Sequence, residues 1–370
     1  MDFTSRLTEM IALLKQLVET GSPTHDKAAV NRLGAIMARE AQKLGAKIEI
    51  VPKATVGDQV IARWGEGPGG ILLIGHMDTV YPLGILSKMP FHEKDGKIFG
   101  PGVLDMKSGL VITLMAISAL QEAGQMPARP ITAFFNTDEE MGSYESREII
   151  EKLGKDAELV LVHEPAEPDG ALLTWRKGTG KFKVKVQGRA AHSGGEHEKG
   201  LNAIAELAQH IVAIQNLTDY EKGTTINIGA VQGGRAINIV PAYAEADGDI
   251  RIMQTSEYYK VEEVINSLEP IQKDIVIEVS CNLNRQPLPF NNLMEATFDK
   301  AYNIAKGIGQ EIKAGGSGSA SDANFIAPLG VPVLDGLGGS GEGFHSDDEY
   351  VFVKSLPERA SLTAALLRDW

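Results

Sequence analysis

The chain has 370 residues, and its 49 acidic side chains outnumber 36 basic ones to give a formal net charge of −13. A chain of this length forms one large domain or two ordinary ones, at roughly 100–200 residues each. The hydrophobic content of 43% excludes a disordered chain, and the acidity disfavours nucleic acid and anionic membranes as partners.

The cysteine content and the N-terminal segment indicate a cytoplasmic protein. Cys281 is the single cysteine, which excludes an internal disulfide and fits a reducing compartment. Lys15 interrupts the first apolar stretch, so the core of a signal peptide is not expected. The longest apolar run, 110–120, is shorter than the ~20 residues that cross a bilayer.

The first 160 residues alternate between helical and strand patterns. Apolar residues at three- and four-residue spacing, with glycine and proline at the ends, predict helices at 3–18, 27–44, 107–123 and 143–153. Short apolar or alternating runs predict strands at 47–50, 71–74, 131–135 and 158–162. This order predicts an α/β fold with a mostly parallel sheet and helices on both of its faces.

The pattern changes near residue 178 and returns to the first kind after about residue 290. Residues 181–186 alternate strictly between polar and apolar side chains, as in a half-exposed strand. The predicted elements that follow are a helix at 201–215, strands at 224–231 and 243–252, a helix at 257–268 and a strand at 274–281. The order β-α-β-β-α-β is that of a ferredoxin-like domain.

Residues that can bind metals follow three of the predicted central strands. These are His76 and Asp78, the acids 138–140, and His163 with Glu164; Asp105 and His345 lie in glycine-containing segments. Ligands of open α/β sheets bind at the carboxyl ends of the strands, where these residues are expected. Each has an ordinary alternative, such as a helix N-cap at Asp105 or a solvated turn at 138–140, but together they indicate a metal centre.

The motifs form an ordered series that is more specific than any one of them. In chain order they are GHMDTV, GPGVLDMKSG, NTDEEMGS, HEP, GRAAHSG, INIVPAYAEADGDIR, SDANFIAPLG and GFHSDDEYV. In this series, over essentially its whole length, the chain resembles the zinc-dependent exopeptidase and amidohydrolase family. That family includes glutamate carboxypeptidases, aminoacylases, succinyl-diaminopimelate desuccinylases and tripeptide peptidases.

The resemblance implies a dinuclear-metal hydrolase and gives each matching residue a role. The implied ligands are His76 and Glu164 for one ion, Glu140 and His345 for the other, and Asp105 as the bridge between them. Asp78 would orient His76, and Glu139 would act as the general base. Zinc is the ion expected, with cobalt and manganese left open because availability and affinity both matter. His163 is not expected to be a ligand, because neighbours on a strand face opposite ways.

The implied metal site also predicts the domain organisation. Since Glu164 and His345 must meet, residues 1–177 and 291–370 are expected to form one catalytic domain around an inserted domain, 178–290. In the resembling family this insert is a lid and often a dimerisation domain, so a homodimer is expected.

Four residues of the insert match functional positions of the family. His192 matches the lid histidine that stabilises the tetrahedral intermediate, and Asn238 and Arg251 match residues that bind substrate. Arg285 resembles a carboxylate-binding arginine of glutamate carboxypeptidases.

The expected substrate is a small peptide or an N-acyl amino acid, cleaved at the amide bond next to a free carboxylate. A carboxypeptidase or dipeptidase is the first hypothesis and an aminoacylase-type deacylase the second. A two-metal phosphoesterase fits poorly with a lid that handles carboxylates, and a non-catalytic metal-binding protein does not need the spare acid Glu139. Residues 170–173 lack the lysine that selects acidic side chains in glutamate carboxypeptidases, so the preferred side chain stays open.

Overall fold

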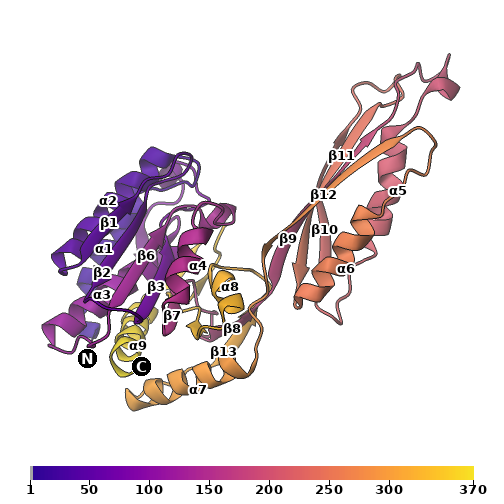
Figure 1. The fold of residues 1–370 in the computed structure, drawn as a ribbon. Coiled ribbons are helices and arrows are strands. Elements are labelled where there is room, and N and C mark those ends of the chain that lie inside the picture. Colours follow the sequence, from indigo (N-terminus) through magenta and orange to yellow (C-terminus); the bar gives the residue numbers. More distant parts are fainter. Residues whose placement is uncertain (1–2) are drawn as a thin grey trace. The chain divides into compact units, whose positions relative to one another are not determined.

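The computed structural model describes residues 3–370, which divide into two compact units (Figure 1). The first unit extends to Trp175 and continues over Phe290–Ser317 and Ser321–Trp370. The second unit comprises Arg176–Pro289 and Gly318–Ala320. Each unit has its own apolar core, so the two are described separately.

A mixed sheet forms the centre of the first unit. Its strands, in spatial order, are β1 (Lys47–Val51), β2 (Gln59–Trp64), β6 (Ile131–Asn136), β3 (Ile71–His76), β7 (Leu159–Val162) and β14 (Val333–Leu334). The strands β6, β3, β7 and β14 are parallel neighbours, whereas β2 is antiparallel to both β1 and β6. The predicted, mostly parallel sheet is therefore confirmed, with an antiparallel strand β2 that the sequence pattern did not reveal.

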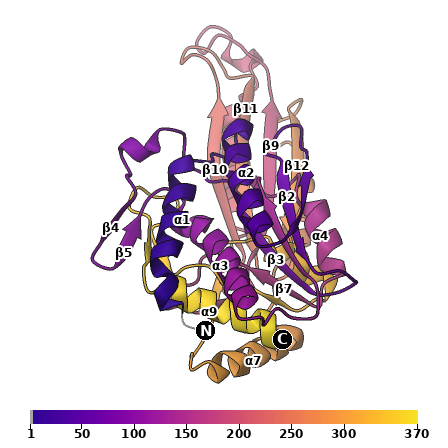
Figure 2. The same ribbon diagram turned by 90° about the vertical axis from the view of Figure 1, so that its left-hand side faces the viewer.

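Helices pack in two groups in this unit. They are α1 (Leu7–Thr20), α2 (Lys27–Lys43), α3 (Ser108–Glu122), α4 (Arg147–Lys155), α7 (Asn292–Gly307), α8 (Ala323–Ile326) and α9 (Ser355–Asp369). The helix α1 packs against α2, α3 and α9, as Figure 2 shows in part, while α4 packs against α8. The stretch Val103–Glu122 is long and apolar enough to cross a membrane, but its most apolar window is 100% buried, as in a core helix.

The helix predicted from residue 143 begins later, at Arg147. Residues Glu139–Met141 form a 3₁₀ turn instead, and Ser143 takes a positive φ of 54° that a helix cannot accommodate. The Ser143 hydroxyl donates a hydrogen bond to Asp322 at 2.5 Å. The predicted start was therefore wrong, because this segment is held as a loop by a contact that is distant in sequence.

The second unit contains one antiparallel sheet and two helices. The sheet order is β10 (Thr225–Gly233), β11 (Tyr243–Ile252), β9 (Gly178–Gln187) and β12 (Val276–Arg285). The helices α5 (Ala203–Gln215) and α6 (Thr255–Asn266) pack on this sheet around buried residues such as Phe182, Leu207 and Tyr258. The chain order is β-α-β-β-α-β.

Two smaller sheets complete the first unit. One contains β15 (Gly341–Glu342), β16 (Tyr350–Phe352), β5 (Lys97–Phe99) and β4 (His92–Lys94), and the other contains β8 (Leu172–Arg176) and β13 (Ala314–Ser317). The pairing of β5 with β16 brings the chain on either side of residue 100 next to the chain near residue 350. This pairing matters for the site described below.

Gly109 lies where α3 passes close to His163, the residue after β7, and Gly109→Ala tests this packing. An added Cβ would lie 2.1 Å from the carbonyl oxygen of His163 and 2.9 Å from Cε of Met106. We expect a loss of about 1–3 kcal/mol in the free energy of unfolding, as in other overpacked cores, measured by chemical denaturation.

Gly307→Ala is the matched control, since a Cβ at this end of α7 would meet nothing within 4 Å. The control is expected to be neutral or stabilising by up to about 1 kcal/mol. Equal stability of the two variants would contradict the close approach of α3 and β7.

Candidate metal centre

Chain segments from five parts of the first unit converge at one edge of the central sheet. The contributing residues are His76 at the end of β3, Asp105 before α3, Glu139 and Glu140 after β6, Glu164 after β7, and His345 between β15 and β16. The strands β3 and β6 end in register, with His76 opposite Asn136, and β7 lies beside β3. Because parallel neighbours end at the same edge, the loops that follow them meet there.

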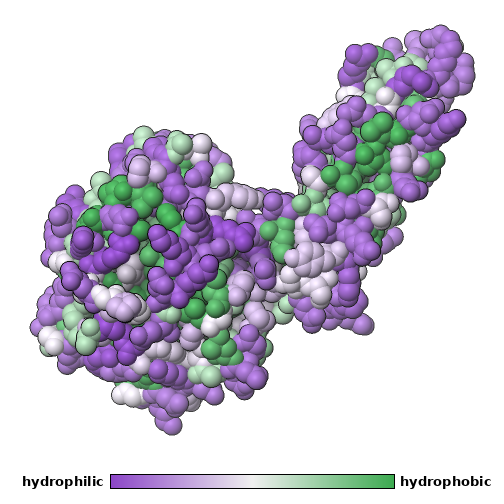
Figure 3. All heavy atoms as spheres, viewed as in Figure 1, coloured by the Kyte–Doolittle hydropathy of each residue, from purple (hydrophilic) through white to green (hydrophobic). Residues whose placement is uncertain are grey.

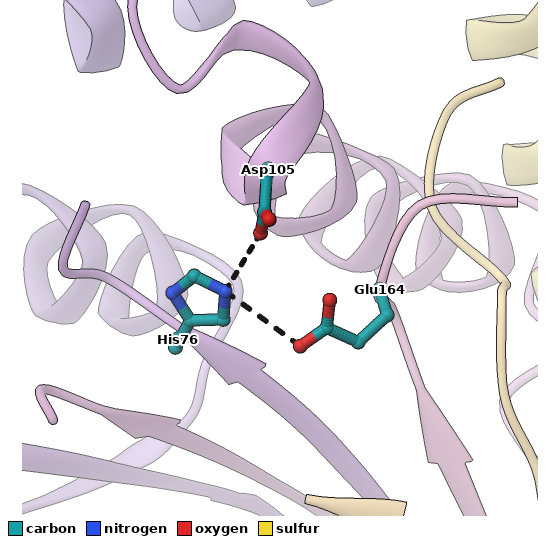
Figure 4. Close-up of side chains that lie close together, drawn as sticks. All are labelled: His76, Asp105 and Glu164. Carbon is teal, nitrogen blue, oxygen red and sulfur yellow. Dashed lines mark hydrogen bonds and ion pairs between the residues drawn. The ribbon is translucent and has the colours of Figure 1, made fainter. Parts of the chain in front are cut away.

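His76, Asp105 and Glu164 form the first group of possible metal ligands (Figure 4). Nε2 of His76 lies 2.9 Å from Oδ1 of Asp105 and 3.6 Å from Oε1 of Glu164. Nδ1 of His76 lies 3.0 Å from the carbonyl oxygen of Asp78. A proton on Nδ1 is placed to donate to this carbonyl, so that Nε2 is the ring nitrogen that faces the two carboxylates and would bind a metal ion.

Asp105, Glu140 and His345 form the second group. Nε2 of His345 lies 3.1 Å from Oε2 of Glu140 and 3.4 Å from Oδ2 of Asp105. Asp105 therefore belongs to both groups, and it presents a different carboxylate oxygen to each histidine. The other oxygen of Glu140, Oε1, is buried and has no hydrogen-bond partner among residues 3–370.

The buried carboxylates of the two groups and their pKa shifts favour the binding of cations. Burial raises the pKa of Glu140 above its usual value. Burial would likewise raise the pKa of Asp105, but hydrogen bonds from His345 and His76 hold that pKa well below its usual range. Hydrogen bonds to Asp105 and Glu140 raise the pKa of His345 to about 10. Divalent ions bound between these groups would replace the histidine protons that such hydrogen bonds require.

The donor set fits such ions. Imidazole nitrogens and carboxylate oxygens are ligands of zinc and related metals, and two groups that share one carboxylate suit a pair of ions. The unpartnered, buried oxygen of Glu140 fits a cation most directly, since it belongs to a ligand group and buried polar atoms of proteins usually have a partner.

Asp78 connects the two groups without belonging to either. Its carboxylate is fully buried, lies 3.5 Å from Nδ1 of His76, and accepts a hydrogen bond of 2.8 Å from the hydroxyl of Thr24. It also accepts backbone N–H bonds of 3.3 Å from both Glu139 and Glu140. One carboxylate thereby fixes the first histidine and the turn that carries the adjacent acids.

The structure reveals further residues around the site that the sequence did not single out. Thr24 carries no motif that points to Asp78. Asp322 accepts hydrogen bonds from Ser143 and Asn136, and it lies in the motif SDANF, whose function the sequence alone does not indicate.

His163 lies outside both ligand groups, as expected from its position next to Glu164. Its Nε2 is 3.3 Å from Oγ1 of Thr363, and burial lowers its pKa to about 3.

The other candidate residues belong to the second unit. His192 is exposed, and its Nδ1 accepts backbone N–H bonds from Gly194 at 3.1 Å and Gly195 at 3.0 Å. This pattern leaves the proton of the neutral ring on Nε2, where it can be donated. The segment of His192 is joined to that of Asn238, whose carbonyl oxygen accepts a bond of 3.1 Å from the N–H of Ser193.

The two arginines share one row of the second sheet. Arg251 on β11 and Arg285 on β12 both pair with Thr179 on the strand β9 between them. Arg251 forms an ion pair of 2.7 Å with Asp249, and Arg285 is buried, with 6% of its surface exposed.

Two histidines and three carboxylates, arranged as two groups at the carboxyl ends of an α/β sheet, define the class of metal-dependent hydrolases. The chain belongs to peptidase family M20/M25/M40, whose family model matches residues 72–369. It is therefore a metallopeptidase-family enzyme that hydrolyses peptide or amide bonds, as the resemblance implied.

Similar proteins cover nearly the whole chain. Carboxypeptidase G2 of Pseudomonas sp. (strain RS-16) is 33% identical over an alignment of 371 positions, which covers 97% of this chain and 89% of that protein. Acetylornithine deacetylase of Proteus mirabilis is 26% identical over 99% of this chain and 97% of its own. The fold is shared with a tripeptidase structure from Staphylococcus aureus, with a TM-score of 0.82 and 22% identity over 98% of both chains.

The two histidines provide a test of the two groups. We expect His76→Ala and His345→Ala each to lose about one metal equivalent per chain, because each removes the nitrogen donor of one group. Elemental analysis of dialysed protein measures this. His92→Ala and His197→Ala are controls, since both residues are exposed and lie outside the groups. Two full equivalents in either ligand variant would refute the assignment.

Proposed function

We propose that the protein is a dinuclear, zinc-dependent exopeptidase that cleaves the amide bond next to a free carboxylate in small peptides. The observation that carries this proposal is the placement of Asp105, with one oxygen toward His76 and the other toward His345. A carboxypeptidase or dipeptidase is the form that we favour, and carboxypeptidase G2 is the relative that supports it.

We propose that some residues of the first unit bind the metal ions and that another transfers a proton. His76 and Glu164 would hold one ion, Glu140 and His345 the other, and Asp105 both. Bound ions of this kind lower the pKa of a water molecule and polarise a carbonyl group. Glu139 lies outside both groups and is only partly buried, which suits a residue that acts on substrate rather than on the metal. We propose that Glu139 accepts the proton that the attacking water loses. It then donates this proton to the leaving amine as the C–N bond breaks.

We propose that the second unit acts as a lid that recognises substrate. The exposed Nε2–H of His192 suits donation to the oxyanion that develops on the carbonyl oxygen. Arg251 and Arg285, on either side of Thr179, offer positive charge for the substrate carboxylate, and Asn238 adjoins the segment of His192.

A homodimer formed through the second unit is part of the proposal. The strand β10 is an edge of its sheet, and edge strands pair readily with another chain. Val231 on this strand and Ile204 and Val212 on α5 are exposed, and Figure 3 shows hydrophobic surface on this unit. Exposed apolar surface of this kind marks association sites, and a second copy is the occupant that we propose.

We also propose a cytoplasmic location for the protein, which the single cysteine, Cys281, supports.

A deacylase that acts on N-acyl amino acids is the second candidate, since acetylornithine deacetylase aligns over 99% of this chain. The purified protein should be assayed on dipeptides, peptides with free and amidated C-termini, N-acyl amino acids and phosphate esters. We expect cleavage of peptides with a free C-terminus only. Preference for N-acyl amino acids would support the second candidate, and activity on phosphate esters alone would overturn both.

Glu139→Ala is expected to keep its metal but to lower turnover by about 10²–10⁴-fold, the usual effect of removing a general base. Metal content and turnover should be measured on the same preparation. Glu148→Ala, an exposed residue of α4, is the control and should change neither quantity. Loss of metal together with activity would make Glu139 a ligand and contradict its proposed role.

Mixing two inactive variants tests whether His192 acts in the site of the neighbouring subunit. A dimer of one His192→Ala chain and one Glu139→Ala chain would have one doubly defective site and one intact site. After subunit exchange at equal concentrations, we expect roughly a quarter of wild-type activity to return, because half of the dimers are mixed. No recovery in demonstrably mixed dimers, or full activity of a strictly monomeric protein, would show that His192 serves its own subunit.

A further inference from the structure

Glu349 is a fully buried carboxylate that contacts the segment carrying Asp105. Its Oε1 accepts N–H bonds from Leu104 at 2.7 Å and from Asp105 at 2.9 Å, and its Oε2 accepts one from Gly102 at 3.1 Å. Three backbone N–H donors hold both oxygens of this buried side chain in place. Glu349 is therefore a fixed anchor for residues 102–105.

The segment that carries Asp105 needs such an anchor. Its backbone departs from helical geometry at Asp105, with φ −110° and ψ 99°, although α3 begins only three residues later. Gly102 has a positive φ of 70°, and a Cβ there would lie 2.6 Å from Cγ2 of Thr79. Regular helical hydrogen bonding thus does not fix the direction of the Asp105 carboxylate, and Glu349 takes N–H groups that would otherwise be buried without an acceptor.

The same residue ties Asp105 to the second histidine. Glu349 follows His345 by four residues and precedes β16, which pairs with β5 just before the Asp105 segment. The loop between His345 and Glu349 is held from a third side, where the hydroxyl of Tyr81 donates a bond of 2.8 Å to the carbonyl oxygen of Ser346. The relative position of Asp105 and His345 therefore depends on the Glu349 contacts.

We infer that Glu349 is a positioning residue for the metal centre: it sets the place of the shared carboxylate of Asp105 and thereby the affinity for the ions. The inference rests on the proposed function, because it assumes that Asp105 binds both ions. Groups that orient metal ligands typically contribute roughly 10–100-fold to metal affinity.

Glu349→Gln tests the inference, because the amide retains one acceptor oxygen but turns an N–H donor toward backbone donors. Metal-stripped protein should be titrated with zinc in competition with a chromophoric chelator. We expect the zinc dissociation constant to rise roughly 10–100-fold, with KM unchanged and with most of the turnover restored at saturating zinc. Glu349→Asp keeps the charge, and we expect it to recover part of the affinity.

Asp348→Asn is the matched control, since it removes the same charge from the adjacent, exposed residue. The unfolding midpoint of each metal-free protein should be measured alongside. A lower midpoint with a zinc dissociation constant within about twofold of wild type, in Glu349→Gln or in Glu349→Asp if the former does not fold, would overturn the inference and leave a structural role. Wild-type protein that binds no zinc would instead refute the proposed function.

Discussion

The carboxylate of Asp105 is the feature on which both ligand groups of the first unit depend. Its two oxygens point to two different histidines, so a single side chain defines both ligand groups. Concentrating carboxylates away from solvent costs free energy unless cations neutralise them. His76 and His345 face these carboxylates, yet one buried oxygen of Glu140 has no hydrogen-bond partner among residues 3–370.

Two neighbouring acidic residues, Asp78 and Glu349, hold the surrounding backbone in place. The carboxylate of Asp78 accepts from a hydroxyl and two backbone N–H groups and lies 3.5 Å from the ring of His76, which fits a structural anion rather than a ligand. Glu349 satisfies three backbone donors on the other side of Asp105. The residues that we propose as metal ligands instead turn their carboxylate oxygens toward the two histidines.

Local pattern was enough to predict the centre of the sheet and the segments that meet at its edge. Apolar runs that end in His76 or lead to Glu140 and Glu164 carry the information within a few residues. The strand β2 was missed although five of its six residues are buried. The start of α4 was misplaced because a hydrogen bond from Ser143 to Asp322, 179 residues away, holds the preceding loop.

The same distinction explains which site residues escaped prediction. Glu349 lies within the motif GFHSDDEYV, but its contact with Asp105 spans 244 residues and depends on the pairing of β5 with β16. Thr24 and Asp78 are 54 residues apart and share no periodic pattern. Ligand types are visible in sequence because metals restrict them, whereas the groups that orient ligands are restricted only by geometry.

The two separate cores give this arrangement a consequence for specificity. Every residue of the two ligand groups belongs to the first unit, whereas His192, Asn238, Arg251 and Arg285 belong to the second, whose apolar residues form their own cluster. If the second unit recognises substrate as we propose, substitutions on its sheet should alter specificity and leave the separate core of the first unit undisturbed. Residues 170–173 contain no lysine, and under the proposed function the row Arg251–Thr179–Arg285 is where we expect the substrate carboxylate to be recognised.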